Sequence, residues 1–329
     1  MPNCSNFWPA RMAESTTGGG HMTDAMPRIL QALRALEGRD ALRADDLAIT
    51  RLGGLTNMVY RVEIGEEKLI VRLPGAGTEA YIDRQVELTN ARAAARAGVS
   101  PEVLWAAPET GVMITRCIDP ATTMTPAGFA ATRGAPARAG RALARLHGSG
   151  ERFDFRFELF AMIDDYLALL ARKNAPLPEG YHDIVASAEP VRAALAANPA
   201  PLAPCHNDPL CENFLDDGHR MWIVDWEYSG MNDPLWDLAD LSVEGSFTPQ
   251  MEAEMLSAYF SRPASAAEQG RVVIYKAMCD LLWTLWGLIQ HADANPAEDF
   301  WAYSLARFDR CKALMQADSF QTHLKALAA

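Results

Sequence analysis

The first part of the chain alternates apolar and polar positions, a pattern typical of strands with one buried face. The clearest example is the segment 58–64, in which Tyr60, Val62 and Ile64 alternate with charged residues. Apolar runs bounded by turn residues predict further strands, with one helix before the first strand and one between the third and fourth strands. The predicted strands are 47–52, 58–64, 68–73, 103–106 and 112–118. The predicted helices are 27–36 and 79–97.

In the second part of the chain the apolar residues recur every three or four positions, the spacing of helices that bury one face. The predicted helices are 138–147, 160–172 and 181–197. The segment 214–224 is an exception, because two short apolar runs flank the turn Asp216-Asp217-Gly218 and predict a β-hairpin. We therefore expect an α+β fold with a small β-rich lobe over 23–116 and a larger, mainly helical lobe over 117–329.

Two segments carry little periodic signal. Residues 1–22 contain the run Thr-Thr-Gly-Gly-Gly and lack the apolar core of a signal peptide. They are predicted to form a flexible leader that takes no part in the fold. Residues 120–134 are rich in Thr, Pro and Gly and are predicted to form a loop.

Composition narrows the class of protein. A chain of 329 residues with 49% hydrophobic and 22% charged residues is ordinary for a globular protein with a substantial core. The net charge of −12 argues against a general nucleic-acid-binding protein, because phosphate backbones favour Lys and Arg. No apolar run reaches the roughly 18–20 residues of a membrane span. The six cysteines form no CxxC pair, which favours reduced thiols and a cytoplasmic protein. The oligomeric state stays open.

Residues with catalytic potential are concentrated in the segment 205–228. The predicted hairpin carries Asp225 back beside Asn213, while Asp208 lies on the loop before it. A carboxylate on a loop, a carboxamide and a carboxylate at a strand end are the groups used in phosphoryl transfer. We expect Asp208 to orient a substrate hydroxyl and accept its proton. Asn213 and Asp225 would offer oxygens to Mg²⁺, with Glu227 available for a second metal ion. A hydrophobic hairpin with polar ends is the alternative.

A glycine turn in the β-rich lobe is a candidate for the phosphate side of a nucleotide site. The run 53–57, Gly-Gly-Leu-Thr-Asn, separates two predicted strands, and such a turn lets backbone N–H groups approach phosphates. Gly54, Thr56 and Asn57 are the candidate residues, although an ordinary turn is the alternative. Arg72, at the end of the third strand, is a candidate for bridging ATP phosphates or else a surface arginine.

Two further positions complete the predicted nucleotide side. Glu87 lies in the middle of the predicted helix 79–97 and is a candidate partner of Arg72. The alternative is a solvated charge on the helix surface. The backbone from Arg116 to Ile118 lies where the chain passes from one lobe to the other, and we expect it to hydrogen-bond adenine.

The catalytic segment resembles a known group of enzymes. H-x-D-x-x-x-x-N at 206–213, followed by an apolar run and D-x-E, resembles the catalytic loop and metal-binding strand of kinase-like phosphotransferases. D-W-E-Y at 225–228, with Asn232 and Trp236-Asp237, is similar to the choline/ethanolamine kinase family within the aminoglycoside-phosphotransferase-like fold. The resemblance covers most of 48–310. It implies a two-lobed protein-kinase-like fold, ATP and Mg²⁺, and nucleotide-side roles for the glycine turn and its neighbours.

A late helix indicates the acceptor. Trp283 and Trp286 are three residues apart and share a helix face, and the family resemblance implies that this face lines a choline site. A trimethylammonium group has no N–H, so aromatic faces and nearby carboxylates must hold it. Tyr228 and Glu244 are the further candidates for substrate contact. From the residues alone, two tryptophans of a buried core are an equal alternative.

These observations predict ATP:choline phosphotransfer, with a small amino alcohol as the partner. Ethanolamine, thiamine and aminoglycoside kinases are alternatives on the same fold. A non-catalytic choline- or nucleotide-binding pseudokinase is an alternative of another class, disfavoured by the presence of Asp208, Asn213 and Asp225. Peptide substrates are not expected, because the short stretch from Asp225 to Trp236 leaves no room for an activation loop.

Overall fold

The computed structural model describes residues 19–52, 57–75 and 82–327. The chain forms two compact units, one made of Met1–Arg84 with Glu102–Cys117 and the other of Gln85–Pro101 with Ile118–Ala329. Strands dominate the described part of the first unit and helices that of the second, as the predicted α+β class requires. The boundary differs from the predicted one, because residues 85–101 belong to the helical unit. The segment predicted as a leader lies largely outside the described residues.

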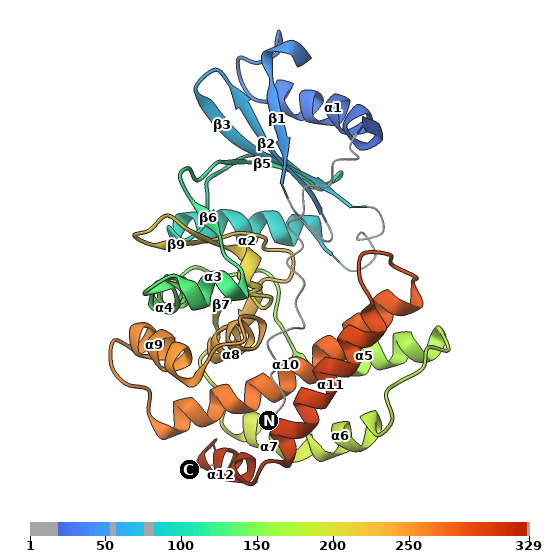
Figure 1. Ribbon diagram of the computed structural model, residues 1–329, viewed down its shortest axis with the longest axis vertical. Coiled ribbons are helices and arrows are strands. Elements are labelled where there is room, and N and C mark those ends of the chain that lie inside the picture. The colour runs from blue at the N-terminus through green and yellow to red at the C-terminus, as the bar shows by residue number, and fades with distance from the viewer. Residues whose placement is uncertain (1–18, 53–56, 76–81, 328–329) are drawn as a thin grey trace. The chain divides into compact units, whose positions relative to one another are not determined.

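The first unit contains one antiparallel sheet in the order β1-β2-β3-β5-β4 (Figure 1). Its strands are β1 (Ala48–Arg51), β2 (Asn57–Ile64), β3 (Glu67–Pro74), β4 (Val103–Ala107) and β5 (Val112–Arg116). The register between β2 and β3 pairs Ile64 with Glu67. Gly65 therefore lies in a two-residue turn, where its φ of 61° falls in the left-handed region that glycine adopts without strain.

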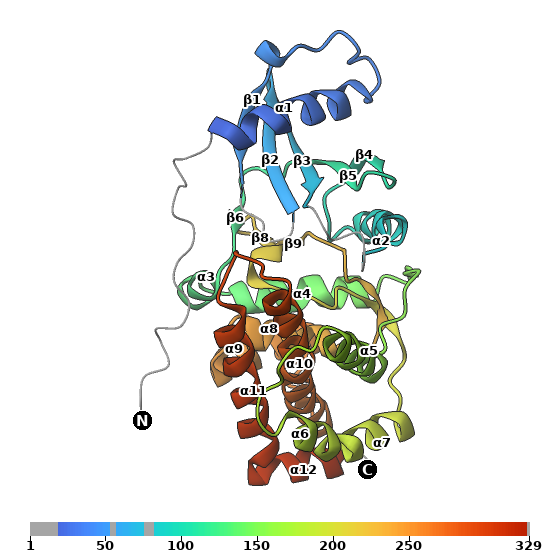
Figure 2. The same ribbon diagram turned by 90° about the vertical axis from the view of Figure 1, so that its right-hand side faces the viewer.

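Among the described residues of this unit, a helix packs on the sheet. The helix α1 (Gly19–Arg34) packs against β3 and β5 (Figure 2), and its Ile29 and Leu33 are fully buried. They meet Tyr60, Val62 and neighbouring side chains of the sheet. The alternation in the sequence of β2 is therefore the alternation between a face packed on α1 and a more exposed face. The helix begins inside the segment predicted as a leader.

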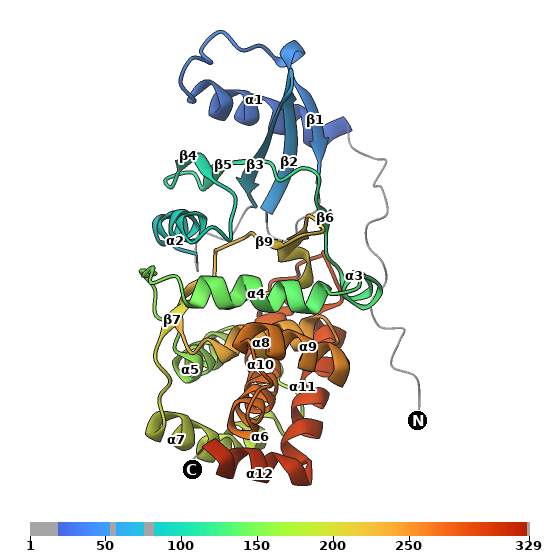
Figure 3. The ribbon, with the colours of Figure 1, turned by 90° about the vertical axis from the view of Figure 1, so that its left-hand side faces the viewer.

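The second unit is built mainly from helices. They are α2 (Arg84–Arg96), α3 (Pro126–Ala131), α4 (Ala135–His147), α5 (Leu159–Arg172), α6 (Tyr181–Ser187), α7 (Glu189–Ala197), α8 (Leu235–Glu244), α9 (Pro249–Phe260), α10 (Ala266–Ala292), α11 (Phe300–Gln316) and α12 (Asp318–Leu327). The helix α10 packs against α5, α8, α11 and α12 (Figure 3). Ser265 and Glu268 form a capping box at its start, which satisfies backbone N–H groups of the first turn.

The helix α10 is long and apolar enough to cross a membrane by length and composition, and 83% of its apolar window is buried inside the protein. This burial is what the central helix of a folded core requires, since such a helix is apolar around most of its surface. Within the described residues it is the one helix that meets the length and composition of a span. It therefore serves as the core of the helical unit.

Two predicted segments differ from the structure for local reasons. The segment 181–197, predicted as one helix, is divided into α6 and α7 at Ala188. Pro190 lies in the first turn of α7, where its missing N–H costs nothing, whereas inside a continuous helix it would remove a hydrogen bond. The segment predicted as a loop over 120–134 contains the short strand β6 (Thr122–Thr123) and α3. Thr125 caps α3 by accepting from the N–H of Gly128 at 2.9 Å.

Candidate active site

A short loop and a hairpin of the helical unit carry the predicted catalytic residues. Strand β7 (Ala203–Cys205) leads into the loop, and a turn of 3₁₀-helix over Cys211–Asn213 leads into β8 (Phe214–Asp216). Strand β9 (Met221–Ile223) then pairs with β8, with Phe214 opposite Ile223. The next backbone N–H, of Val224, donates to the carbonyl of Asn213 at 3.0 Å. The hairpin thus returns the chain to Asn213 just before Asp225, the arrangement that the turn residues predicted.

The carboxamide of Asn213 has a fixed orientation. Its Nδ2 donates to the backbone carbonyl of Asp208 at 3.0 Å, so the amide nitrogen faces the loop. None of the hydrogen bonds described for Asn213 uses Oδ1. That oxygen is therefore the atom available to a ligand, as the predicted role requires. Asp225 has a φ of 69°, a left-handed conformation that is uncommon for residues other than glycine and is found at functional turns.

The helix α2 is joined to the segment after β9. The carboxamide of Asn90 donates to the carbonyl of Ser229 at 3.0 Å, and the indole of Trp226 donates to Ser100 at 2.9 Å. Asn90 is fully buried, so its hydrogen bonds are costly to break. These contacts explain why α2 belongs to the helical unit. They also fix the turn of α2 that contains Glu87.

Glu87 thereby joins an acidic group with Asp225 and Glu227. One carboxylate oxygen from each of the three lies within 4.8 Å of the other two. Carboxylate oxygens are the ligands that Mg²⁺ prefers, and Asn213 Oδ1 has the same chemistry. The donor set therefore fits a magnesium ion. Asp225 and Glu227 are predicted metal ligands, whereas Glu87 is predicted only as a partner of Arg72. The structure therefore adds Glu87 to the candidate metal ligands.

The remaining predicted nucleotide residues lie mostly in the first unit. Gly54 and Thr56 fall outside the described residues. Asn57 is buried at the start of β2. Arg72 lies in β3, where its Nη2 donates to the carbonyl of Gly111 at 3.3 Å. These positions are compatible with a phosphate-side role, which stays a prediction.

The predicted adenine segment begins at the end of β5. The side chain of Arg116 is exposed and forms an ion pair with Glu102 at 2.9 Å, so its guanidinium is engaged at the surface. The predicted contacts of the backbone from Arg116 to Ile118 with adenine stay a prediction. The pairing of Arg72 with Glu87 also stays a prediction.

Asp208 lies in an electrostatically unfavourable place for a carboxylate. Burial, then the neighbouring carboxylates of Glu244 and Glu227, raise its pKa to about 8, while Arg307 acts in the opposite direction. A carboxyl group that holds its proton up to neutral pH is poised to exchange it there. None of the described hydrogen bonds uses the Asp208 carboxylate, which leaves it available to a substrate hydroxyl.

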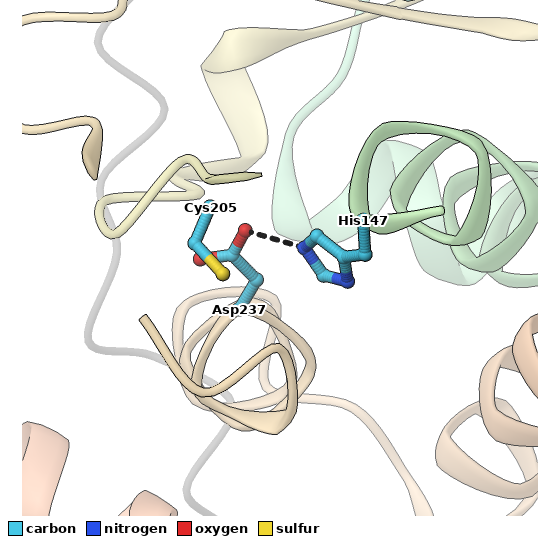
Figure 4. A group of neighbouring side chains, drawn as sticks. All are labelled: His147, Cys205 and Asp237. Atoms are coloured by element: carbon cyan, nitrogen blue, oxygen red, sulfur yellow. Dashed lines mark hydrogen bonds and ion pairs between the residues drawn. The ribbon is translucent and has the colours of Figure 1, made fainter. Parts of the chain in front are cut away.

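Asp237 fixes the catalytic loop by accepting hydrogen bonds from its backbone. Its Oδ1 accepts from the backbone N–H of Asn207 at 2.8 Å and its Oδ2 from that of His206 at 2.7 Å. Its Oδ2 also lies 3.0 Å from His147 Nε2 (Figure 4). A fully buried carboxylate that accepts several N–H groups is well satisfied. In the sequence, Asp237 belongs to a family motif, but no role for it is predicted from that motif.

His206 links the loop to the hairpin. Its Nε2 lies 2.9 Å from the carbonyl of Val224, and its Nδ1 accepts from the backbone N–H of Asp208 at 3.3 Å. The proton of a neutral ring must then sit on Nε2. Burial lowers the pKa of His206, which favours this neutral form. His206 is therefore a positioning residue for Asp208 rather than an acid or a base.

Two of the predicted substrate residues, Tyr228 and Trp283, are in contact. The ring centroids of Tyr228 and Trp283 are 5.6 Å apart in an edge-on arrangement. Trp283 Nε1 points to Asp240 Oδ2 at 3.4 Å, and Glu244 lies within 4.8 Å of Asp240. Trp286 instead packs on two aromatic residues of α11, Phe300 and Tyr303. The two tryptophans therefore have different neighbours, and Asp240 joins the acidic group without having been predicted.

The model of the phosphotransferase enzyme family matches residues 48–269. The chain belongs to this family. A crystal structure of a choline/ethanolamine kinase family protein from Mesorhizobium loti is 58% identical, with a TM-score of 0.84, covering 93% of this chain and 99% of that one. Choline kinase LicA from Streptococcus pneumoniae is 28% identical, with a TM-score of 0.73 and coverage of 90% and 99%. Ethanolamine kinase 2 of Mus musculus is 23% identical over 87% of this chain and 80% of its own.

These comparisons confirm the predicted choline/ethanolamine kinase resemblance and the protein-kinase-like fold. The phosphotransferase is an enzyme that transfers a phosphoryl group to the hydroxyl of a small molecule. The alternative of a non-catalytic pseudokinase is not supported, because the matching family is one of phosphotransferases and the relatives include a choline kinase. The relatives include both choline and ethanolamine kinases, so they leave open which alcohol is the acceptor.

Proposed function

We propose that the enzyme is an ATP-dependent choline kinase, which transfers the γ-phosphoryl group of ATP directly to the choline hydroxyl. The observation that carries the proposal is the combination of Asp208 with Glu244 and the Tyr228–Trp283 pair in one acidic and aromatic cluster. An acid that can take a hydroxyl proton thus lies near groups that attract a quaternary ammonium. Choline carries both a hydroxyl and such an ammonium group.

In the proposed reaction the choline hydroxyl gives its proton to Asp208 as its oxygen attacks the γ-phosphorus, and ADP leaves. The carboxylate form of Asp208 is the active one. Glu244 and Glu227 raise its pKa, so the arrival of a cationic substrate would offset their charge and favour the ionised base. Most of the rate enhancement in such reactions comes from positioning and charge neutralisation.

A magnesium ion held by Asn213, Asp225 and Glu227, with Glu87 beside them, would neutralise charge that develops on the phosphates. The oxygens of this group support the assignment. His206 and Asp237 keep the loop in place while the acceptor binds. We expect these events to take place in the cytoplasm, since the cysteines described in the structure are unpaired.

Choline is favoured over ethanolamine by the aromatic component of the cluster. Tyr228 and Trp283 offer ring surface to a cation, worth about 0.5–2 kcal/mol per contact. Ethanolamine carries N–H groups that need acceptors, and it is the second candidate because curated relatives include ethanolamine kinases. Thiamine and aminoglycosides have no such specific support.

The test is a comparison of kcat/KM for choline, ethanolamine and thiamine with purified protein and Mg²⁺-ATP. We expect choline to have the highest value, and a chelator of divalent cations to abolish turnover. In Asp208→Ala, turnover should fall by about 10²–10⁴, the usual contribution of a general base. A higher kcat/KM for ethanolamine would refute choline as the preferred acceptor. Turnover close to that of the wild type in Asp208→Ala would refute the role of Asp208.

A further inference from the structure

A buried arginine occupies the acidic cluster from the side of α11. Arg307 is 4% exposed, and its Nη2 forms an ion pair with Glu244 Oε1. Its Nη1 lies 3.3 Å from Asp280 Oδ1, and its guanidinium lies over the ring of Tyr303, 4.6 Å from the centroid. One guanidinium thus joins α8, α10 and the aromatic residues of α11. The sequence pattern predicts no role for this residue.

The two acids that Arg307 contacts are not equivalent. Asp280 is fully buried and also receives two hydrogen bonds from Arg310, at 2.9 and 2.6 Å. Glu244 is 8% exposed, and its only ion-pair partner within the described residues is Arg307. Without Arg307, Asp280 would still be paired with Arg310, whereas Glu244 would lose its ion pair.

The neighbouring carboxylate, Asp240, is also engaged within the protein. Its Oδ1 accepts from the thiol of Cys279 at 2.8 Å, and its Oδ2 faces the indole N–H of Trp283 at 3.4 Å. Both oxygens of Asp240, both oxygens of Asp280 and Oε1 of Glu244 thus already have donors within the protein. A ligand cation would find negative charge and aromatic surface there, but few acceptors for N–H groups.

We propose that Arg307 is a specificity-determining residue, which holds the carboxylate of Glu244 so that the enzyme accepts quaternary ammonium groups in preference to primary ones. This inference rests on the proposed function. Choline and ethanolamine carry the same charge at neutral pH, so any repulsion by Arg307 acts on both and largely cancels in their ratio. The difference between them is that the ammonium of ethanolamine loses its hydrogen bonds to water and must replace them. With Glu244 Oε1 bound to Arg307, only Oε2 of that carboxylate is left to replace them.

The test is the ratio of kcat/KM for choline to kcat/KM for ethanolamine. In Arg307→Met, Glu244 becomes available to the primary ammonium, and the ratio should fall by about tenfold or more, the effect of one hydrogen bond to a charged group. Arg310→Met is the matched control, since Arg310 contacts Asp280 but not Glu244, and its ratio should stay within about twofold of the wild type. An unchanged ratio in Arg307→Met, or an equal fall in Arg310→Met, would overturn the proposal.

A second variant keeps the test independent of whether Arg307→Met folds. Glu244→Gln removes the charge but can still accept from Arg307, so both substrates should be affected alike and the ratio should be preserved. If Glu244→Gln lowered kcat/KM for ethanolamine but not for choline, Glu244 would bind the N–H groups of ethanolamine directly, and the proposal would fail. The wild-type ratio separately tests the choline assignment, because the role of Arg307 is measured by the change that its substitution causes.

Discussion

Replacing Asp208 by Asn should make the ligand-free enzyme more stable at alkaline pH while removing its activity. Asn has nearly the same shape, and none of the described hydrogen bonds uses the Asp208 carboxylate, so the substitution removes charge and little else. In the folded protein the pKa of this carboxyl is raised from 3.8 to about 8 by burial and by nearby carboxylates. The folded state therefore retains a proton that the unfolded chain has already lost.

The sign and size of the effect follow from proton linkage. Because the folded pKa is the higher one, the stability of the wild type falls as the pH rises from 3.8 to about 8, and the loss is complete above about 8. The full shift corresponds to roughly 6 kcal/mol. Asp208 is only half-buried, and solvent screens its neighbours, so we expect about 2 kcal/mol. In a chain of this size that is a rise in Tm of about 3 °C.

The assay is thermal denaturation of both proteins without nucleotide or metal, at about pH 5 and about pH 9. Asp208→Asn should be more stable than the wild type at the higher pH, and the advantage should shrink at the lower pH. Its turnover should fall by about 10²–10⁴ at both. Equal stability of the two proteins at the higher pH, or a gain of the same size at both, would refute the electrostatic argument.

Two further substitutions test the support of the site and the packing of the helical unit. Asp237→Asn places an amide against backbone N–H donors. We expect the variant to lose about 2–3 kcal/mol of stability and its kcat to fall by about tenfold or more. An unchanged kcat would contradict the role of Asp237 as a support of the loop. Gly140→Ala would place a methyl group 2.3 Å from the carbonyl oxygen of Met255. We therefore expect a loss of about 1–3 kcal/mol in the free energy of unfolding, measured as a lower Tm. The intrinsic helix preference of Ala would raise Tm instead, and a rise in Tm would show that α4 and α9 can separate at little cost.

Several parts of the fold followed from local patterns. The alternation through Tyr60 and Val62 corresponds to β2, whose two residues are buried against α1. The turn at Asp217-Gly218 corresponds to the hairpin between β8 and β9, and this hairpin brings the segment after Val224 beside Asn213. Such patterns suffice where the partners are close in sequence, because turn chemistry and side-chain alternation are local properties.

Other parts of the site depend on contacts between distant segments. Nothing in the charge pattern of α11 distinguishes Arg307, which pairs with Glu244, from the exposed pair of Lys312 with Asp309. The buried hydrogen bonds of Asn90 fix the turn of α2 that brings Glu87 beside Asp225 and Glu227. Which of these residues are in contact cannot be predicted from their local sequence patterns. Burial and packing between helices decide that, and they become visible only once the fold is known.

The helix α8 has a consequence for changing the substrate of this enzyme. Asp237 and Asp240 are three residues apart, and Glu244 follows four residues later, so the helix carries the support of the loop and the acids of the substrate cluster on adjoining turns. A shift of α8 that reshapes one would displace the other. Attempts to broaden or switch the accepted alcohol should therefore diversify side chains of α10 and α11 before those of α8, because changes in α10 and α11 leave the support of the catalytic loop in place.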